Sequence, residues 1–363
     1  MASPFSVDIT PDWQGLLGCI RRRGTPERVF HIELFLDPEV EAAIWDRYNL
    51  GDGIDGHDPF YDLRRKVALQ RFLGYDYVYV SCEDEVPMPL MQTTVQDSAA
   101  LERTGGRTFM DEQRGPITNW QAFESYPWPD PEVASMAAFE WYEENLPQDM
   151  CVIAFGGFSH LFEYLSWLMG YETLCYSLYD RRDLVAAISE RLIDISRRVL
   201  DRILGFERVK LIWGSDDMGF RTATLISPQD LREFILPGHK LLAEMSHAAG
   251  RPYLLHSCGN LARIMDDLID DVGIDALHSF EDTITTVTEA KKAFGDRIAL
   301  LGGVDVDFLC RADEMQVRQR VRQTLDVCMP GGGYCLGSGN SIANYVPLGN
   351  YLAMLDEGRR YAA

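Results

Sequence analysis

Eight short runs rich in β-branched and aromatic residues recur along this chain, and longer amphipathic segments separate them. The runs lie at 28–35, 75–81, 150–157, 210–217, 252–259, 276–281, 298–305 and 333–339. Between them, segments such as 183–204 and 227–250 carry apolar residues at spacings of three and four, which predicts helices. Eight strands that alternate with helices favour a closed, parallel (β/α)8 TIM barrel over an open sheet.

One region does not fit this alternation. Residues 82–130 are rich in Pro, Thr and Gly and end near "YPWPDPE". A connection of this length inside a compact domain is usually a functional loop. We therefore expect a long insertion after the second strand, with room for a hairpin, that folds over the barrel mouth. The whole of 1–363 is expected to form one domain, with an N-terminal extension ahead of the first strand.

Charge and cysteine content exclude several kinds of partner. The formal net charge is −22, from 34 Lys and Arg against 56 Asp and Glu, so nucleic acid and anionic membranes are not expected to bind. No window approaches about 18 uninterrupted apolar residues, which argues against a membrane span. Eight irregularly spaced cysteines and an N-terminus without an export signal predict a reducing cytoplasm.

Active sites of such barrels form at the carboxyl ends of the strands. Here those positions hold polar and ionisable residues, whereas the strands themselves are apolar. The predicted site residues are Glu33, Asp216, Asp217, His256, Cys258, Glu281, Gly302, Gly303, Asp305 and Asn340. Gly302, Gly303 and Asp305 belong to "LGGVD", a turn whose backbone N–H groups could face a cofactor, although a tight turn explains the glycines equally well.

The segment "PYLLHSCGN" places an imidazole and a thiol two positions apart at the end of the fifth strand. Side chains at i and i+2 point to the same side of a strand, so His256 and Cys258 would face one cavity. Both are ligands that zinc accepts. The alternative is a buried cysteine beside a histidine that bonds to a neighbouring carbonyl group.

A catalytic zinc site needs about three protein ligands, and the third is open. Cys335 lies inside the last strand and reads as a core residue. Glu33, Asp216 and Glu281 are oxygen donors at other strand ends, and any of them could complete a site with His256 and Cys258. Glu33 is included in the predicted ligand set.

Four segments together are similar to the uroporphyrinogen decarboxylase superfamily, which also contains corrinoid-dependent methyltransferases. They are "CIRRRGTPERVFHIELFLDPEV", "HSCGNLARIMDDLIDDVGIDALHSFED", "DRIALLGGVDVDFL" and "GGGYCLGSGNSIANYVPLGNYLAML". Decarboxylases of this superfamily carry an arginine-rich stretch after the first strand, where this chain has "IELFLDPEV" with Glu33, Asp37 and Glu39. Without those arginines, and with a net charge of −22, a porphyrinogen bearing many carboxylates would remain unpaired.

The methyltransferase branch is the closer resemblance. Its members bind zinc through His-x-Cys on strand five, which His256 and Cys258 match, and through a cysteine near the end of strand eight. In "GSGNSI" that last position is Asn340. Either a carboxylate replaces the cysteine as ligand, or Asn340 contacts substrate while the metal lies differently, or zinc is absent. The resemblance implies methyl transfer between a small methyl ether or thiol and a corrinoid carried by a partner protein, and it allows a homodimer.

In this interpretation Asp216, Asp217 or Glu281 orients the substrate, donates a proton or supplies the missing ligand. Two alternatives stay open at this point. One is a metal-free lyase or decarboxylase in which Asp216 or Asp217 holds a cationic intermediate. The other is a non-catalytic module that docks a corrinoid protein.

Overall fold

The computed structural model describes residues 3–81 and 87–361, and its centre is one sheet of eight parallel strands. All eight strands expected from the sequence are present. They are β1 (Phe30–His31), β2 (Tyr77–Ser81), β5 (Cys151–Phe155), β6 (Val209–Ser215), β7 (Tyr253–His256), β8 (Ala276–His278), β9 (Ala299–Leu301) and β10 (Tyr334–Leu336). Their order in the sheet is β1-β10-β9-β8-β7-β6-β5-β2, which is the neighbour order of a (β/α)8 barrel.

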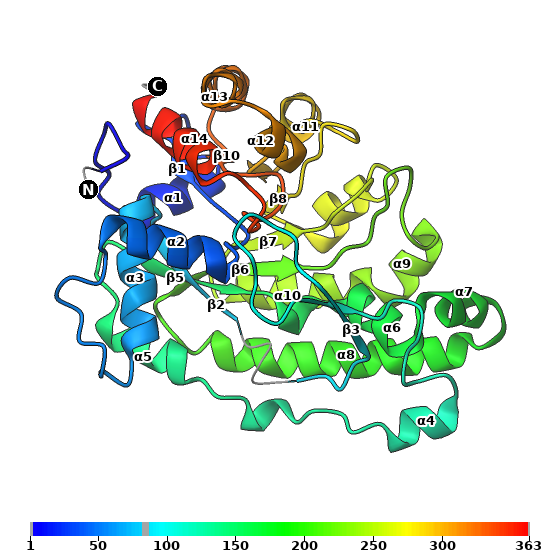
Figure 1. The fold of residues 1–363 in the computed structure, drawn as a ribbon. Helices are drawn as coiled ribbons and strands as arrows, with labels where there is room; N and C mark the ends of the chain where they lie inside the picture. Colours follow the sequence, from blue (N-terminus) through cyan, green and yellow to red (C-terminus); the bar gives the residue numbers. More distant parts are fainter. Residues whose placement is uncertain (1–2, 82–86, 362–363) are drawn as a thin grey trace.

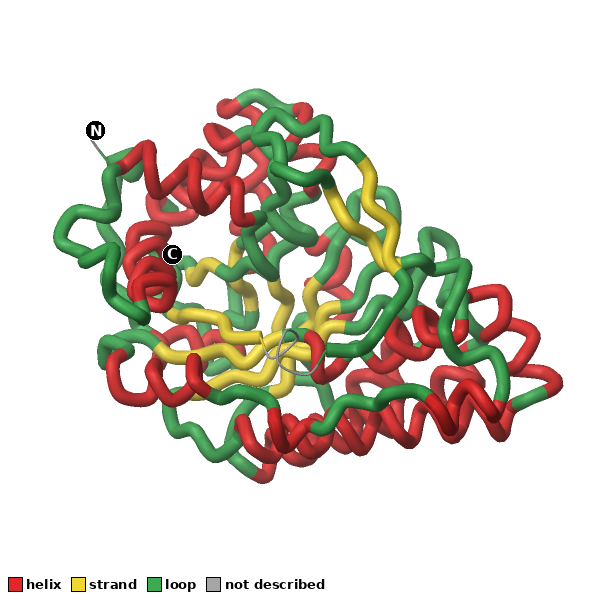
Figure 2. The backbone as a smooth tube through the Cα atoms, turned by 60° about the horizontal axis from the view of Figure 1, so that its bottom comes forward, coloured by secondary structure: helices red, strands yellow, loops and turns green. Residues whose placement is uncertain are grey.

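The two outer strands of this curled sheet meet through a side chain. No backbone ladder joins β1 to β2 within the described ranges. Instead the Glu33 backbone N–H donates to the Tyr77 hydroxyl at 2.9 Å, and that hydroxyl lies 3.3 Å from the Glu33 carbonyl oxygen. Figure 2 shows the strands gathered at the centre with helices around them. The structure therefore confirms the TIM-barrel-like class.

Helices enclose the sheet on its outer side (Figure 1). They are α1 (Trp13–Ile20), α2 (Pro38–Tyr48), α3 (Tyr61–Leu73), α5 (Ala137–Asn145), α6 (Leu161–Met169), α7 (Tyr171–Asp180), α8 (Arg182–Ile203), α9 (Pro228–Phe234), α10 (Leu236–Ala248), α11 (Val287–Phe294), α12 (Val306–Arg311), α13 (Glu314–Cys328) and α14 (Leu348–Arg360). Short 3₁₀ turns lie at Pro131–Val133 and Gly157–Ser159, and a π-helical turn at Asp267–Val272.

The strands are apolar on both faces because helices cover one face and the barrel interior the other. Every residue of β5, β7, β8, β9 and β10 is buried. The amphipathic pattern of 183–204 forms α8, whose apolar stripe packs against the barrel. The extension before β1 contains α1, and its Cys19 thiol donates to the Tyr334 carbonyl oxygen at the base of β10. No helix in the described part is long and apolar enough to cross a bilayer.

The insertion after β2 contains an antiparallel hairpin of β3 (Gln92–Val95) and β4 (Arg107–Met110), followed by the short helix α4 (Trp120–Ser125). Residues 82–86 of this segment lie outside the described residues. Figure 2 shows the hairpin standing apart from the central strands. Arg107 binds Asp37 at 2.8 Å, in the loop after β1, and the Asn344 side-chain oxygen at 2.6 Å, in the loop after β10. These contacts tie the hairpin to the carboxyl end of the barrel.

Candidate metal centre

The centre begins where β6 and β7 end side by side. Ser215 pairs with His256 in the parallel ladder, so Asp217 is level with Cys258. Beyond the ladder the two chains stay in contact, because Gly219 donates to the Cys258 carbonyl oxygen at 3.1 Å. Gly259 has φ +88°, and a Cβ there would lie 2.2 Å from the Gly219 carbonyl carbon. Only glycine permits this close approach of the two loops.

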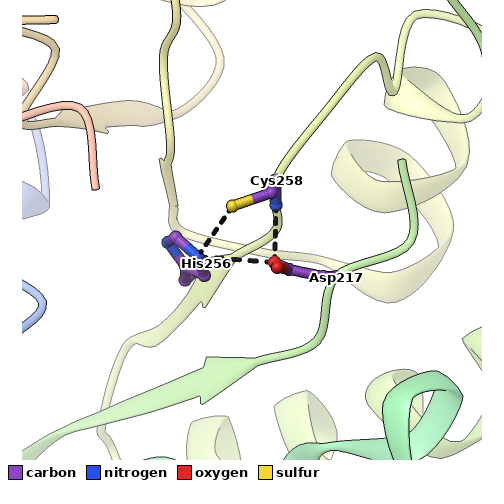
Figure 3. A group of neighbouring side chains, drawn as sticks. All are labelled: Asp217, His256 and Cys258. Carbon is purple, nitrogen blue, oxygen red and sulfur yellow. Dashed lines mark hydrogen bonds and ion pairs between the residues drawn. The ribbon is translucent and has the colours of Figure 1, made fainter. Parts of the chain in front are cut away.

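Three side chains of different chemistry converge at this point: Asp217, His256 and Cys258 (Figure 3). One ligand atom from each lies within 4.8 Å of the others. His256 Nε2 is 3.4 Å from Cys258 Sγ and 3.4 Å from Asp217 Oδ1. The Cys258 backbone N–H donates to Asp217 Oδ1 at 2.8 Å, which fixes the carboxylate. The structure thus brings the expected His-x-Cys pair together with Asp217.

The electrostatics of the three groups favour a bound cation. Burial alone would lower the pKa of His256, but the adjacent Cys258 and Asp217 raise it to about 10. Burial opposes ionisation of Asp217, yet the hydrogen bond and charge of His256 lower the pKa of this carboxyl group to about 2. The Cys258 thiol and the Asp217 carboxyl group are two potential anions at this point. Either a proton on His256 or a divalent metal ion can supply the positive charge that they attract.

Neighbouring groups orient the sulfur and the imidazole. The Asn340 side-chain N–H donates to Cys258 Sγ at 3.2 Å, and the Ser279 hydroxyl lies 3.5 Å from the same sulfur. His256 Nδ1 lies 2.7 Å from Nδ1 of the buried His278. Burial and the charge of His256 hold the pKa of His278 well below its ordinary value, so His278 is the neutral partner of this pair. A metal ion that displaces the Nε2 proton would leave the remaining proton on His256 Nδ1, where it can be donated to His278.

This donor set fits zinc. Imidazole nitrogen, thiolate sulfur and carboxylate oxygen are the ligand types of zinc, and catalytic sites use about three protein ligands with one position open. The hydrogen bond from His256 to His278 is the outer support that metal-ligating histidines normally have. Asp217 supplies the third candidate ligand atom, a carboxylate oxygen, beside His256 and Cys258. Asn340 instead forms a hydrogen bond to the Cys258 sulfur.

Asp216 faces the opposite way from Asp217. Its carboxylate is fully buried and accepts hydrogen bonds from the backbone N–H groups of Phe162 and Glu163 at 2.9 and 3.0 Å. Both amides belong to the first turn of α6. His239 Nε2 binds the same carboxylate at 2.9 Å. Asp216 therefore anchors a helix N-terminus, and neither of its oxygens is directed at the metal centre.

Glu33 is also separate from the centre, although it is part of the predicted ligand set. Its two oxygens accept the Ser338 backbone N–H at 2.8 Å and the Ser338 hydroxyl at 2.6 Å. Burial raises the pKa of Glu33 to about 8, and the bonds from Ser338 offset only part of that effect. This carboxyl group links β1 to the loop after β10.

The predicted cofactor turn is a packed element of the barrel. Gly302 N–H donates to the Cys335 carbonyl oxygen and Gly303 N–H to the Ser338 carbonyl oxygen, at 2.8 and 3.0 Å, so neither amide is free for a cofactor. A Cβ on Gly302 would lie 2.1 Å from the Ser338 oxygen. Asp305 caps α12 by accepting the Phe308 N–H at 2.9 Å.

Several pockets adjoin the centre, and two of them contain one of its ligands or Asn340. The first encloses about 1300 Å³ of empty space open to solvent, and its lining includes Asp217, Glu163 and Trp167. The second encloses about 1130 Å³ beyond Asn340, and its lining includes Glu281 and Phe308. Glu281 is half-buried, and burial with the charges of Asp305 and Asp217 raises its pKa. Asp217 thus lines the first pocket, and Asn340, which contacts Cys258 Sγ, lines the second.

His278 and Ser279 were not predicted from the sequence. They lie in "ALHSFE" at the end of β8, a strand that the sequence did predict. One signal in the sequence could have identified them. Consecutive strands of such a barrel are parallel neighbours, and His278 ends β8 as His256 ends β7, so the two residues pair in the ladder. A strand-end histidine next to the His-x-Cys strand would have identified the supporting residue.

Comparison with known proteins gives related results at three levels. Residues 112–361 match the family described as uroporphyrinogen decarboxylase (URO-D). The chain is 30% identical over 139 residues to methylcobamide:CoM methyltransferase MtaA of Methanosarcina barkeri, which covers 38% of this chain and 39% of that protein. It is 32% identical over 133 residues to a methylated-thiol–coenzyme M methyltransferase of Methanosarcina mazei, covering 36% of this chain and 33% of the relative.

These alignments therefore span well under half of either relative. A solved structure of a methyltransferase from Methanosarcina mazei shares the fold, with a TM-score of 0.68 over 96% of this chain and 98% of the other, at 17% sequence identity. The family match covers most of the chain and agrees with the resemblance of the four sequence segments. The protein belongs to the uroporphyrinogen decarboxylase family.

Proposed function

We propose that this protein is a methyltransferase that moves a methyl group between a small methyl ether or thiol and a corrinoid carried by a partner protein, with zinc held by Asp217, His256 and Cys258. The observation that carries the proposal is the convergence of these three ligand atoms within 4.8 Å at the carboxyl end of the barrel. The names of two relatives, both methyltransferases and one of them specific for methylcobamide, support the corrinoid link.

Bound zinc would supply Lewis-acid chemistry, stabilising negative charge on a substrate oxygen or sulfur. The chain's own groups prepare the site for that ion. Asn340 and Ser279 donate toward Cys258 Sγ and hold the sulfur in place for the ion. His278 keeps the proton of His256 on Nδ1.

Glu281 has the position of a proton carrier. It lines the pocket beyond Asn340, and no ion pair of its carboxylate appears among the described residues. When an alkoxide or phenoxide leaves a methyl ether, a carboxylic acid nearby can protonate it. We assign this role to Glu281, and we assign substrate contact to Asn340, whose side chain lies between that pocket and Cys258.

Metal content and methyl transfer test the proposal together. The purified protein should contain about one zinc ion per chain, and His256→Ala, Cys258→Ala and Asp217→Ala should each lose it. His247→Ala is the matched control, because His247 is exposed and pairs with Asp275 outside the centre. Methyl transfer is followed by the absorbance change when methylcobalamin is mixed with a thiol. A protein without stoichiometric metal, whose transfer rate survives all three changes, would refute the proposal.

A further inference from the structure

Two of the pockets that adjoin the metal centre are lined by carboxylates. The pocket beside α6 and α7 contains Glu112, Glu163, Glu172 and Asp217. The pocket between the loops after β8, β9 and β10 contains Glu281, Asp282, Asp305 and Asp307. A small molecule that reaches the centre from either side therefore passes several acidic groups.

Positive charge that could offset these groups is already paired. Arg311 is the one Lys or Arg that lines either pocket in the described part of the chain, and it binds Asp307 at 2.7 Å. The nearby Arg320 binds Asp282 at 2.7 Å. Arg221 lines neither pocket, and its charge offsets only part of the rise in the pKa of Glu281. Among the described residues that line either pocket, no cation without a carboxylate partner is available to an anionic group of a substrate.

The metal ion itself would not reverse this balance. A divalent ion bound by the Cys258 thiolate and the Asp217 carboxylate has no net charge together with these ligands. An anionic group several ångströms from the ion would then be exposed mainly to the remaining carboxylates. Losing its hydration there without gaining a counterion is unfavourable.

The remaining lining of the first pocket suits an uncharged, apolar molecule. Phe162, Trp167, Tyr171 and Phe220 all line it, and Phe220 is 63% exposed. Aromatic walls favour flat or apolar groups, and with carboxylates nearby they also tolerate a positive charge.

We infer that the methyl-carrying or methyl-accepting small molecule of this site has no negative charge, and that a sulfonate or carboxylate on it prevents tight binding. This inference rests on the proposed function, since it takes the centre to be the place of methyl transfer. The class of ligand is an uncharged ether or thiol. Coenzyme M, a sulfonated thiol that both relatives name, is outside this class.

Two series of probes separate charge from shape. The thiol series is 2-mercaptoethanol, 2-mercaptoethylamine and 2-mercaptoethanesulfonate, which are neutral, cationic and anionic. The ether pair is 4-methoxybenzyl alcohol and 4-methoxybenzoate. Binding to the zinc-loaded protein is measured by calorimetry at low salt, because screening weakens charge effects. We expect the anionic member of each series to bind at least about tenfold more weakly than the neutral one.

A charge-reversal variant shows whether the pocket causes this preference. Glu172→Lys places a cation at the exposed rim of the first pocket, and the ratio of Kd for the sulfonate to Kd for the alcohol should fall by about threefold. Glu144→Lys makes the same change of net charge on α5 and lines neither pocket, so it should leave the ratio unchanged.

The outcomes distinguish this inference from the proposed function. Equal or tighter binding of the anionic member, no binding of either neutral probe, or an equal response of Glu172→Lys and Glu144→Lys overturns the charge preference. Methyl transfer from methylcobalamin to the sulfonate alone would overturn it as well and leave the proposed function standing. A protein that binds the neutral probes but transfers no methyl group refutes the function and retains the preference.

Discussion

Replacing Asp216 with alanine should destabilise the fold without removing the metal ligands. The buried carboxylate accepts three hydrogen bonds, from two amides of α6 and from His239 Nε2, at 2.9, 3.0 and 2.9 Å. Each donor left without a partner in the interior costs about 1–3 kcal/mol. Three donors therefore cost about 3–9 kcal/mol in total. We expect the free energy of unfolding to fall by about 4 kcal/mol, near the low end of this range, because water can enter the space of the removed side chain.

The change in melting temperature follows from the size of the chain. Unfolding of 363 residues has an entropy of about 0.8 kcal/mol/K, so a loss of about 4 kcal/mol lowers Tm by about 5 °C. Calorimetry and urea unfolding followed by circular dichroism measure both quantities. The protein must be free of metal, because an ion that binds the native state raises its apparent stability.

Asp217→Ala is the matched comparison for this experiment. The Asp217 side chain is 39% exposed, so its loss should change the free energy of unfolding of the metal-free protein by about 1 kcal/mol or less, while metal binding is lost. Asp216→Ala should still bind zinc when folded. Our assignment of the two neighbours is refuted if Asp216→Ala has the same Tm as the wild type. It is also refuted if Asp216→Ala loses zinc while Asp217→Ala keeps it.

Three further changes test other groups at the same end of the barrel. Because burial raises the pKa of Glu33 from 4.5 to about 8, its contribution to stability is complete below about pH 4.5 and is lost as pH rises to about 8. The urea stability of wild type relative to Glu33→Gln should therefore fall with pH by up to about 1.4 kcal/mol per unit across this window, and a constant difference contradicts the assignment. His278→Leu should weaken zinc binding by about 10- to 100-fold in a competition assay with a chelator, whereas His278→Asn, which can still accept from His256 Nδ1, should retain most of the affinity. Asn340→Cys should add a sulfur ligand beside Cys258 and raise the intensity of the thiolate-to-cobalt absorption of the cobalt-substituted protein; an unchanged spectrum would place residue 340 outside the coordination sphere.

The sequence was sufficient for the strands and for the His-x-Cys pair because both depend on local periodicity. Alternating apolar runs mark each strand, and a spacing of two puts His256 and Cys258 on one side. The choice between Asp216 and Asp217 could not be made locally. Successive side chains at a strand end point in opposite directions, and the register of Ser215 with His256 decides which of the two meets Cys258.

The glycines of "LGGVD" show a second limit of local reasoning. A ligand-binding loop and a tight turn both require positive φ, and Gly302 and Gly303 have φ values of +73° and +104°. Only the partners of their N–H groups distinguish the two. These partners are Cys335 in β10 and Ser338 just after it, more than thirty residues away in sequence. Long-range pairing of this kind leaves no signature in the turn itself.

The acidic residues at the carboxyl end of the barrel have two different uses, and this difference explains how one rim serves both stability and binding. Asp216 and Asp305 accept backbone N–H groups and fix the starts of α6 and α12. The oxygens of these two carboxylates are occupied by hydrogen bonds and are not available to bind a ligand. Asp217 and Glu281 line the pockets. Asp217 lies beside His256 and Cys258 in the metal centre, whereas Glu281 has no ion pair among the described residues. A negative rim built on fixed loops therefore remains selective against anions even when the metal site is filled.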